Sequence, residues 1–494
     1  MTDASAGTLA LGSLAAAVPG ARLHGAAATA IASLALDSRR LPPGALFVAL
    51  RGERVDGHAY LAAAVAAGAR ALVIDDAYAA AHGVPNSGLA TLIVADTRRA
   101  LSSLANAFYR EPTRGLRVTG ITGTNGKTTT THLVAALLEA GGIATGRIGT
   151  LGAAFGGALW SLDNTTPLAL ELQALFAAMR ERGARAVAME VSSHALALDR
   201  VADVTFAIAV LTNVTRDHLD FHGTFEAYAA TKRALFERAP LAILNADDPC
   251  GARWAAELVA LGRTPLTYGF GEAALRAREI ELCAHGSRFV VDGARFETRL
   301  PGRFNVANAL AALAVARAHG VDDALAARAL AAFERVPGRM EHLAGGGVDV
   351  LVDYAHTPDA LDAVLRAARE TAAGDLTVVF GCGGDRDRGK RPEMGRIASA
   401  TADRVVVTSD NPRGESPQAI VDDILAGVAA ADNVVTLLDR RSAIAHAIAL
   451  ARPGDVVVVA GKGHETYQLV GTAVHHFDDR DEVRAALAAR SAVP

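Results

Sequence analysis

The chain of 494 residues has few cysteines, no long apolar run and almost no excess of charge. The three cysteines are scattered without C-x-x-C spacing, which argues against a disulfide framework and a structural zinc site and fits a reducing cytoplasm. No uninterrupted apolar run reaches transmembrane length, so we expect no stable membrane association. The net charge of −4 does not favour nucleic acid as the main partner, so any anion must be bound by local phosphate sites.

The N-terminus makes a poor signal peptide, because Asp3 precedes the apolar stretch and the first basic residue is Arg22. We therefore expect a cytoplasmic protein. At roughly 150 residues per domain the length suggests about three domains, each large enough for its own core. The many alanines weaken the distinction between helix and strand by periodicity, and no internal repeat is visible.

A glycine-rich segment at residues 118–130 is the most informative part of the chain. It reads as a buried strand, a turn with Gly120, Gly123 and Gly126, and a helix that starts at Lys127. Glycines let backbone N–H groups turn toward an anion, the helix N-terminus adds its dipole, and the hydroxyl of Thr128 can ligate Mg²⁺. The segment predicts a nucleoside triphosphate site, with ATP as the ligand.

One observation and one alternative interpretation bear on that prediction. The first glycine of the pattern G-x-x-x-x-G-K-[ST] would fall at position 121, where this chain has Ile121. The alternative interpretation is an ordinary glycine-rich turn between a strand and a helix.

Breaks in the pattern of strands and helices divide the chain into three α/β parts. The polar segment 109–114 marks the first boundary, and the segment 335–339 marks the second. Apolar runs predict the strands, and after residue 340 they alternate with helices, which is typical of a doubly wound fold. The expected strands are 45–50, 71–74, 186–190, 206–211, 241–245, 348–353, 376–380, 403–408, 433–437 and 455–460.

Polar side chains follow two of the expected strands where ligands of parallel sheets bind. Glu190 ends one strand, and the segment 212–220, which includes His218, follows another. A carboxylate and an imidazole near a phosphate loop are reasonable partners of Mg²⁺. The alternatives are that Glu190 caps a helix or a turn and that His218 is simply solvated.

The expected helix around residues 225–236 carries a lysine on its apolar face. Lys232 lies four residues after Tyr228 and four before Phe236. Its ammonium could extend to the surface. It could instead be desolvated with a depressed pKa, so that the neutral amine reacts with CO₂ to give a carbamate, an anionic metal ligand.

Three further loops follow strands of the last part, at residues 381–386, 409–413 and 461–465, and should converge on one crevice. Arg386 and Arg413 can grip carboxylates, while Asp410 and Glu465 can receive an ammonium. Such a crevice suits a free amino-acid zwitterion. The alternative is a set of surface salt bridges.

Five motifs together resemble the Mur ligases of peptidoglycan synthesis, over nearly the whole chain and in the family's order. They are GTNGKTT (123–129), DNTTP (163–167), EVSSH (190–194), NVTRDHLD (213–220) and DYAHTP (353–358). The resemblance implies an ATP-dependent amide ligase with three domains. These are an N-terminal α/β domain (1–113) for the UDP-sugar, a central P-loop ATPase-like parallel-sheet domain (114–340) for ATP, and a C-terminal Rossmann-like domain (341–494) for the amino acid.

The resemblance also assigns roles to residues. It implies a carbamylated Lys232, acting with His218 at a Mg²⁺ site, and a catalytic set of Lys127, Glu190, His218 and Lys232. Metal ligands would be Thr128, Glu190, His218 and Lys232. ATP contacts would be Gly123, Thr124, Asn125, Gly126, Lys127, Thr128, Thr129, Asn305, Asn308, Arg339 and Asp353. Contacts to the UDP-sugar-peptide would be Ser38, Asn164, Thr165, Thr166, Ser192 and Arg200.

The Asp-Asn-Pro-Arg motif at 410–413 resembles that of the members that add meso-diaminopimelate. The resemblance then implies addition of this amino acid to UDP-N-acetylmuramoyl-L-alanyl-D-glutamate through an acyl phosphate, by a monomer whose partners are small molecules. Its contacts would be Arg386, Asp410, Asn411, Pro412, Arg413, Gly461 and Glu465.

Two departures from the family pattern concern the nucleotide-sugar end. Leu198 stands where relatives carry glutamine, and Glu53-Arg54-Val55 replaces a His-Gln-Ala loop. Rival functions are an L-lysine-adding or another muramyl or folylpolyglutamate ligase, and a P-loop kinase or an ATP-dependent binding protein. A kinase would need no second pocket for a zwitterion.

Overall fold

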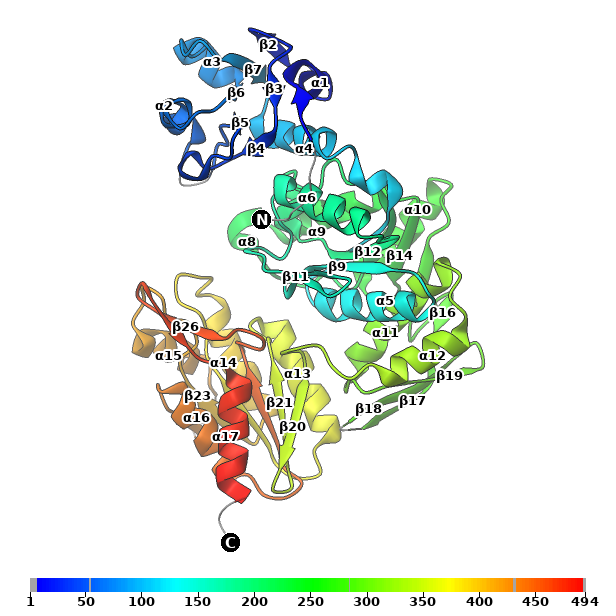
Figure 1. Ribbon diagram of the computed structural model, residues 1–494. Helices are drawn as coiled ribbons and strands as arrows, with labels where there is room; N and C mark the ends of the chain where they lie inside the picture. The colour runs from blue at the N-terminus through cyan, green and yellow to red at the C-terminus, as the bar shows by residue number, and fades with distance from the viewer. Residues whose placement is uncertain (1–6, 53–54, 284, 430–431, 492–494) are drawn as a thin grey trace. The chain divides into compact units, whose positions relative to one another are not determined.

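The structure is a computed structural model that describes residues 7–52, 55–283, 285–429 and 432–491 (Figure 1). Glu53 and Arg54, in the loop that departs from the family pattern, thus lie outside the described residues. Two compact units make up the chain. The first comprises Met1–Thr122, Gly142–Val210 and Ala229–Ala242, and the second comprises Gly123–Gly141, Leu211–Tyr228 and Ile243–Pro494.

The N-terminal part of the first unit is built on a five-stranded sheet. Its order is β2-β7-β6-β5-β4, with β2 antiparallel to β7 and the other neighbours parallel. The strands are β2 (Arg22–His24), β4 (Ser33–Ala35), β5 (Ala45–Val48), β6 (Ala71–Asp75) and β7 (Ala90–Val94), and a small pair is formed by β1 (Leu9–Ala10) and β3 (Ala30–Ile31). The helices are α1 (Leu11–Ala16), α2 (Leu61–Ala66), α3 (Asp76–His82) and α4 (Thr97–Phe108).

The rest of the first unit contains strands in the order β11-β10-β9-β12-β8-β13. Strand β12 (Ala186–Glu190) runs parallel to β8 (Arg117–Thr122) and to β9 (Thr145–Gly149). All five residues of β12 are buried, as an apolar run in a covered parallel sheet predicts. The other elements are β10 (Gly152–Phe155), β11 (Ala158–Trp160), β13 (Phe206–Leu211), α6 (Ala169–Glu181) and α7 (Ser193–Ala197).

The second unit begins with the helix that follows the glycine-rich turn, α5 (Lys127–Ala140), which packs against α11 (Arg303–Ala318) and α12 (Asp323–Ala332). Its strands β14 (Leu241–Asn245), β15 (Leu266–Gly269) and β16 (Leu275–Arg276) are parallel neighbours. An antiparallel three-stranded sheet follows, formed by β17 (Arg278–Cys283), β18 (Gly286–Val291) and β19 (Ala294–Thr298). The remaining helices here are α8 (Leu219–His222), α9 (Phe225–Arg238), which continues into the first unit, and α10 (Pro249–Ala260).

The C-terminal part of the second unit is a six-stranded sheet with helices on both faces (Figure 1). The order is β20-β21-β25-β22-β23-β24, with only the edge strand β20 antiparallel. The strands are β20 (Glu341–Gly345), β21 (Val348–Asp353), β22 (Leu376–Phe380), β23 (Arg404–Val407), β24 (Val434–Thr436) and β25 (Val456–Ala460), and a separate hairpin is formed by β26 (Tyr467–Val470) and β27 (Ala473–His476).

Alternate residues of the C-terminal strands enter two cores. Val378 and Val458 lie in the core under α13 (Pro358–Thr371), α14 (Lys390–Thr401) and α15 (Pro417–Leu425). Val379 and Val459 lie in the core under α16 (Arg440–Leu450) and α17 (Asp479–Ser491). This is the doubly wound arrangement that the alternation of strands and helices predicts.

The ten strands expected from apolar runs are all present, with bounds that differ by at most two residues. The mixed α/β fold with parallel sheets is therefore confirmed. No helix in the described part of the chain combines the length and the apolar character needed to cross a membrane.

Candidate functional site

The glycine-rich turn between β8 and α5 has a backbone that only glycine can adopt. Gly123 and Gly126 have φ of 153° and 85°. A Cβ on Gly123 would lie 1.9 Å from Oγ1 of Thr212, and one on Gly126 would lie 2.5 Å from Oδ1 of Asn308. The two glycines thus let the loop pack closely against Thr212 and Asn308.

Lys127 begins α5 and folds back over this loop. Its Nζ donates hydrogen bonds to the carbonyl oxygens of Gly123 and Thr124, both at 2.8 Å. The ammonium therefore lies at the concave side of the turn, next to the N-terminal end of a fourteen-residue helix. Cation and helix dipole together favour an anion at this place.

The loop after β13 fixes the shape of the phosphate loop. Asn213 accepts from N–H of Asn125 through Oδ1 at 2.9 Å, and Thr212 donates to the carbonyl of Asn125 at 2.6 Å. The hydroxyl of Thr124 accepts from N–H of Thr215 at 2.9 Å. These bonds hold the loop without using the N–H groups at the first turn of α5.

Two asparagines of α11 stand beside the first turn of α5. Asn308 donates to Oδ1 of Asn305 at 3.0 Å and accepts from the hydroxyl of Thr130 at 3.3 Å. Both asparagines are buried. The predicted ATP contacts Asn305 and Asn308 are thus adjacent to the phosphate loop, where Asn308 forms the wall behind Gly126.

Arg339 reaches the same helix start from the beginning of the C-terminal part. Its Nη2 lies 3.3 Å from Oγ1 of Thr128, and its guanidinium lies 4.4 Å from the ring centre of Tyr354. Asp353 accepts from the backbone N–H groups of Met340 and Ala355 at 2.7 and 2.8 Å. Asp353 therefore supports the chain next to Arg339 with both carboxylate oxygens.

His218, a predicted metal ligand, lies at the start of α8 with φ of 52°. Its Nε2 is 3.4 Å from Oδ2 of Asp217, and its ring centre is 6.3 Å from that of Tyr228. The hydroxyl of Tyr228 lies 3.0 Å from that of Thr124. Burial raises the pKa of Tyr228, so this phenol stays protonated and can hydrogen-bond the loop.

The first unit brings together the predicted sugar-peptide residues Thr166, Ser192 and Arg200. Thr166 donates to the carbonyl of Glu190 at 2.9 Å and accepts from N–H of Ser192 at 3.1 Å. Arg200 donates to the carbonyl of Thr166 at 2.9 Å. The hydroxyl of Thr165 lies 3.1 Å from that of Thr150.

Glu190 is buried at the end of β12, and both carboxylate oxygens are hydrogen-bonded. They accept from N–H of Thr150 at 2.8 Å and from its hydroxyl at 3.1 Å. Gly149 must be a glycine here, because a Cβ would lie 2.2 Å from Oε1. Glu190 thus caps the turn after β9, as the alternative interpretation expected, and its position stays fixed by that contact.

Three further predicted residues differ in how far they are exposed. Lys232 is only 1 % exposed in α9, so its ammonium does not extend to the surface, and that alternative is wrong. Ser38 is buried and Asn164 is exposed.

The three loops of the C-terminal sheet meet, as the rule for parallel sheets predicts. Asn411 donates to Oε2 of Glu465 at 2.9 Å. Gly461, with φ of 118°, approaches Asp410 so closely that a Cβ would lie 2.6 Å from Oδ2. Burial and the neighbouring Asp410 raise the pKa of Glu465. Asp410 and Glu465 are therefore close enough to interact electrostatically, and the ammonium of Lys462 lies 3.6 Å from Glu465.

Arg413 belongs to the second of these loops and reaches the first. It has φ of 51°, and its Nη1 donates to the carbonyl of Gly384 at 2.8 Å. Gly383 leaves room for it, since a Cβ there would lie 2.8 Å from Nη1 of Arg413 and 3.8 Å from Cγ of Arg386. Both predicted arginines thus stand over Gly383, with Arg386 exposed and Arg413 half-buried.

Two buried charged residues near these loops were not expected from the sequence. Lys462 is fully buried, and Nζ donates to the carbonyl of Tyr467 at 2.7 Å. Arg391 is also fully buried, with a two-point contact to Glu415 at 2.8 and 2.9 Å. A signal was present for the lysine, because the chain has lysine at four positions only, 127, 232, 390 and 462, and uses arginine elsewhere.

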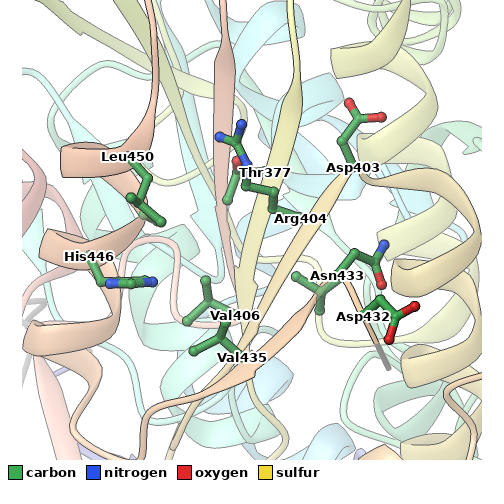
Figure 2. Close-up of a pocket in the computed structure, with 11 residues that line it drawn as sticks. Thr377, Asp403, Arg404, Val406, Asp432, Asn433, Val435, His446 and Leu450 are labelled. Carbon is green, nitrogen blue, oxygen red and sulfur yellow. The ribbon is translucent and has the colours of Figure 1, made fainter. Parts of the chain in front are cut away.

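One pocket of the C-terminal part lies away from these loops (Figure 2). Its volume is about 280 Å³, and its lining includes Thr377, Arg404 and Asn433, each within one residue of the start of β22, β23 or β24. The crevice loops follow the opposite ends of the same parallel strands. The pocket is therefore at the amino-end edge of the sheet and is separate from the crevice.

Three family models match successive parts of the chain. They are "Mur ligase family, catalytic domain" over residues 30–109, "Mur ligase middle domain" over 121–316 and "Mur ligase, glutamate ligase domain" over 338–463.

Relatives match over nearly their whole length. The UDP-N-acetylmuramoyl-L-alanyl-D-glutamate–2,6-diaminopimelate ligase of Gloeobacter violaceus is 47% identical over 470 residues, which cover 93% of this chain and 94% of the relative. A solved structure of an enzyme with the same name is 34% identical, with a TM-score of 0.66 and coverage of 93% and 95%. The MurF ligase of Thermotoga maritima, solved with ADP, shares the fold at 21% identity and a TM-score of 0.64, with coverage of 93% and 97%. The chain belongs to the Mur ligase family.

Proposed function

We propose that this protein is an ATP-dependent ligase that adds meso-2,6-diaminopimelate to UDP-N-acetylmuramoyl-L-alanyl-D-glutamate. The observation that carries the proposal is the crevice in which Arg413 stands over Gly383 while Asp410 and Glu465 are close enough to interact electrostatically. The names of the full-length relatives at 47% identity support the same substrates.

The geometry of the glycines and the lysine in the phosphate loop supports ATP as the ligand. The backbone at Gly123 and Gly126 leaves no space for a side chain. The Lys127 ammonium donates to the carbonyl oxygens of Gly123 and Thr124, which phosphate oxygens can replace. Asn305, Asn308, Arg339 and Asp353 would complete the nucleotide site, together with Thr124, Asn125, Thr128 and Thr129.

Mg²⁺ suits the chemistry of the predicted donors, which offer oxygen atoms and one imidazole. Thr128, Glu190 and His218 would hold the ion together with a carbamate on Lys232, and the ion would neutralise charge on the β- and γ-phosphates. The burial of Lys232 supports this role, because its nitrogen lies inside the protein and not at the surface. The carboxylate of Glu190 is already oriented by Thr150.

The reaction joins a carboxylate to an amine, which needs prior activation. The γ-phosphoryl group of ATP moves to the D-glutamate side-chain carboxylate, giving ADP and an acyl phosphate, while Lys127 stabilises the charge on the transferred group. The diaminopimelate amine then attacks the carbonyl carbon. The C–O bond to phosphate breaks, phosphate leaves, and the amine loses its proton as the amide forms.

The crevice gives a physical reason for diaminopimelate over lysine. The far end of diaminopimelate carries both an ammonium and a carboxylate, whereas lysine ends in an ammonium alone. Arg413, with Arg386 beside it, would bind that carboxylate, and Asp410 and Glu465 would receive the ammonium. Asn411, Pro412 and Gly461 shape the loops that carry these charges.

The three family models support a division into residues 1–113 for the UDP-sugar, 114–340 for ATP and 341–494 for the amino acid. Ser38 would contact the uridine end, and Asn164, Thr165, Thr166, Ser192 and Arg200 the sugar-peptide. We propose further that the protein is a monomer, that it acts in the cytoplasm and that its partners are small molecules.

The test is phosphate release from ATP by the purified protein with the muramyl dipeptide nucleotide and either amino acid. The proposal expects release that requires both the nucleotide and diaminopimelate, with lysine a poor substitute. Equal rates with lysine would contradict the amino-acid assignment, and release without any amino acid would favour a kinase or an ATPase.

A further inference from the structure

A group of potential metal ligands lies in the second unit among residues that have no part in the proposed reaction. His285 directly precedes β18, His342 lies in β20, and Asp349 lies in β21. One ligand atom from each residue lies within 4.8 Å of the others.

The β20–β21 hairpin places two of the ligands on the same face. His342 pairs with Leu351, and Ala344 pairs with Asp349, so His342 and Asp349 are diagonal neighbours across the ladder. Nε2 of His342 lies 2.7 Å from Oδ1 of Asp349. Both side chains are partly exposed, at 27% and 30%, so an ion from solvent can reach them.

His285 completes the group from another sheet. Its ring centre lies 4.8 Å from that of His342, at an interplanar angle of 62°. The two imidazoles are therefore in edge contact rather than stacked. His285 is exposed, so its ring can rotate without displacing any core residue.

We propose that His285, His342 and Asp349 bind a divalent transition-metal ion of the zinc class, with water as the remaining ligand. Imidazole nitrogens together with one carboxylate oxygen suit zinc, which three protein ligands and a water can hold. Two donors at about 2.0 Å from a tetrahedral ion are about 3.3 Å apart. The observed group meets that distance if the exposed ring of His285 moves inward by about 1.5 Å while the pair of His342 and Asp349 opens slightly.

The ion would tie the β17–β18 hairpin to the β20–β21 hairpin. These hairpins are 50 or more residues apart along the chain. The rings of His285 and His342 are in contact, so an ion bound by both would link the two hairpins. No cysteine takes part, so the absence of cysteine pairs in the sequence does not bear on this site. Mg²⁺ prefers oxygen ligands, so the metal of the proposed ATP site should not compete.

The test measures zinc binding by equilibrium dialysis, on full-length protein freed of metal and then kept in excess Mg²⁺. His285→Ala removes an exposed ligand, and Asp349→Asn removes the anion but keeps an acceptor for His342. Loss of a residue that merely orients a metal ligand costs about 10–100-fold in affinity. Each variant should therefore bind zinc at least about tenfold more weakly than the wild type.

His476→Ala is the matched control, because His476 is an exposed histidine of β27 beside another histidine, His475. Its zinc affinity should equal that of the wild type. A second readout uses Co²⁺, whose visible absorption should appear in wild type and be lost in His285→Ala. Unchanged zinc affinity in His285→Ala, or loss of the site in His476→Ala, would overturn the proposal.

Discussion

The ammonium of Lys462 donates a hydrogen bond to Oδ1 of Asn411 over 3.0 Å, and both residues are buried where loops of the C-terminal sheet meet. The same oxygen accepts from N–H of Leu469 at 2.9 Å, and the ammonium also reaches the carbonyl of Tyr467. Lys462 thus joins the loop after β25 to the Asp-Asn-Pro-Arg loop. Glu465 lies 3.6 Å from the ammonium and balances its charge.

Replacement of this lysine should destabilise the C-terminal part. Lys462→Met has similar length but leaves Asn411 and the nearby Glu465 without the cation. Removing one partner of a buried charged pair costs about 3–5 kcal/mol, so the free energy of unfolding in urea should fall by about that amount. Arg396→Met, at an exposed position of α14, should stay within about 0.5 kcal/mol of the wild type. Similar stability of the two variants would contradict this role of Lys462.

Lys127→Ala should abolish turnover while the protein stays folded. The ammonium is the cation of the phosphate loop, and loss of one group that stabilises transition-state charge costs about 100-fold or more in kcat. The measurement is ligase activity beside the circular dichroism spectrum and the unfolding midpoint. A folded variant with normal activity would show that the loop does not hold the triphosphate.

Lys232→Ala should lose activity and recover part of it when a small carboxylic acid is added. The acid can replace a carbamate anion but cannot replace an ammonium. Rescue by acetate or formate, and no rescue by methylammonium, is the expected result. Full activity of the unrescued variant would contradict a catalytic role for the buried lysine.

A spectroscopic measurement tests the same modification without turnover. Wild-type protein equilibrated with ¹³C-bicarbonate should show a carbamate resonance that Lys232→Ala lacks. Lys390→Ala is the matched control, since Lys390 donates to the carbonyl of His356 and should not be modified. A resonance that persists in Lys232→Ala would place the carbamate elsewhere.

Much of the fold could be predicted because parallel strands leave a strong trace in a sequence. Strands β12, β13, β14, β21 and β22 occupy the apolar runs residue for residue, since both faces of each are covered. The antiparallel sheet of β17, β18 and β19 was not predicted. Residues of β17 are mostly exposed or half-buried and carry charges, so no apolar run marks it.

The candidate site could be predicted where a residue's position after the end of a strand determines its neighbours. The rule that ligand loops follow the carboxyl ends of strands brought Asn411 and Glu465 together correctly. Buried charges escaped prediction, because Arg391 and Lys462 read as surface residues until their partners in other elements are known. Helical spacing, by contrast, placed Lys232 on the buried face of α9, as found.

Gly383→Ala should impair diaminopimelate binding without removing any charge. The added Cβ would lie 2.8 Å from Nη1 of Arg413, the mobile end of that side chain, so the guanidinium must move while the backbone stays. We expect a raised KM for diaminopimelate and unchanged KM values for ATP and the muramyl nucleotide. Gly389→Ala is the control, because Gly389 has an ordinary φ and a Cβ there would meet only Asp387, at 3.2 Å. Gly262→Ala would not serve, because Gly262 has a φ of 75° that strains alanine. An unchanged KM in Gly383→Ala would show that the position of Arg413 is not critical.

The most direct test of the account compares kcat/KM for diaminopimelate and lysine in wild type and Arg413→Ala. The backbone of residue 413 keeps its hydrogen bonds to Leu469 and Gly471, so the loop should stay in place. If the guanidinium binds the distal carboxylate, the loss should cost about 2–5 kcal/mol, which is about 30-fold or more in kcat/KM for diaminopimelate. Lysine lacks that carboxylate, so its kcat/KM should be unchanged or higher. An equal fall for both amino acids would contradict the assignment of Arg413, and with it the diaminopimelate specificity proposed for this protein.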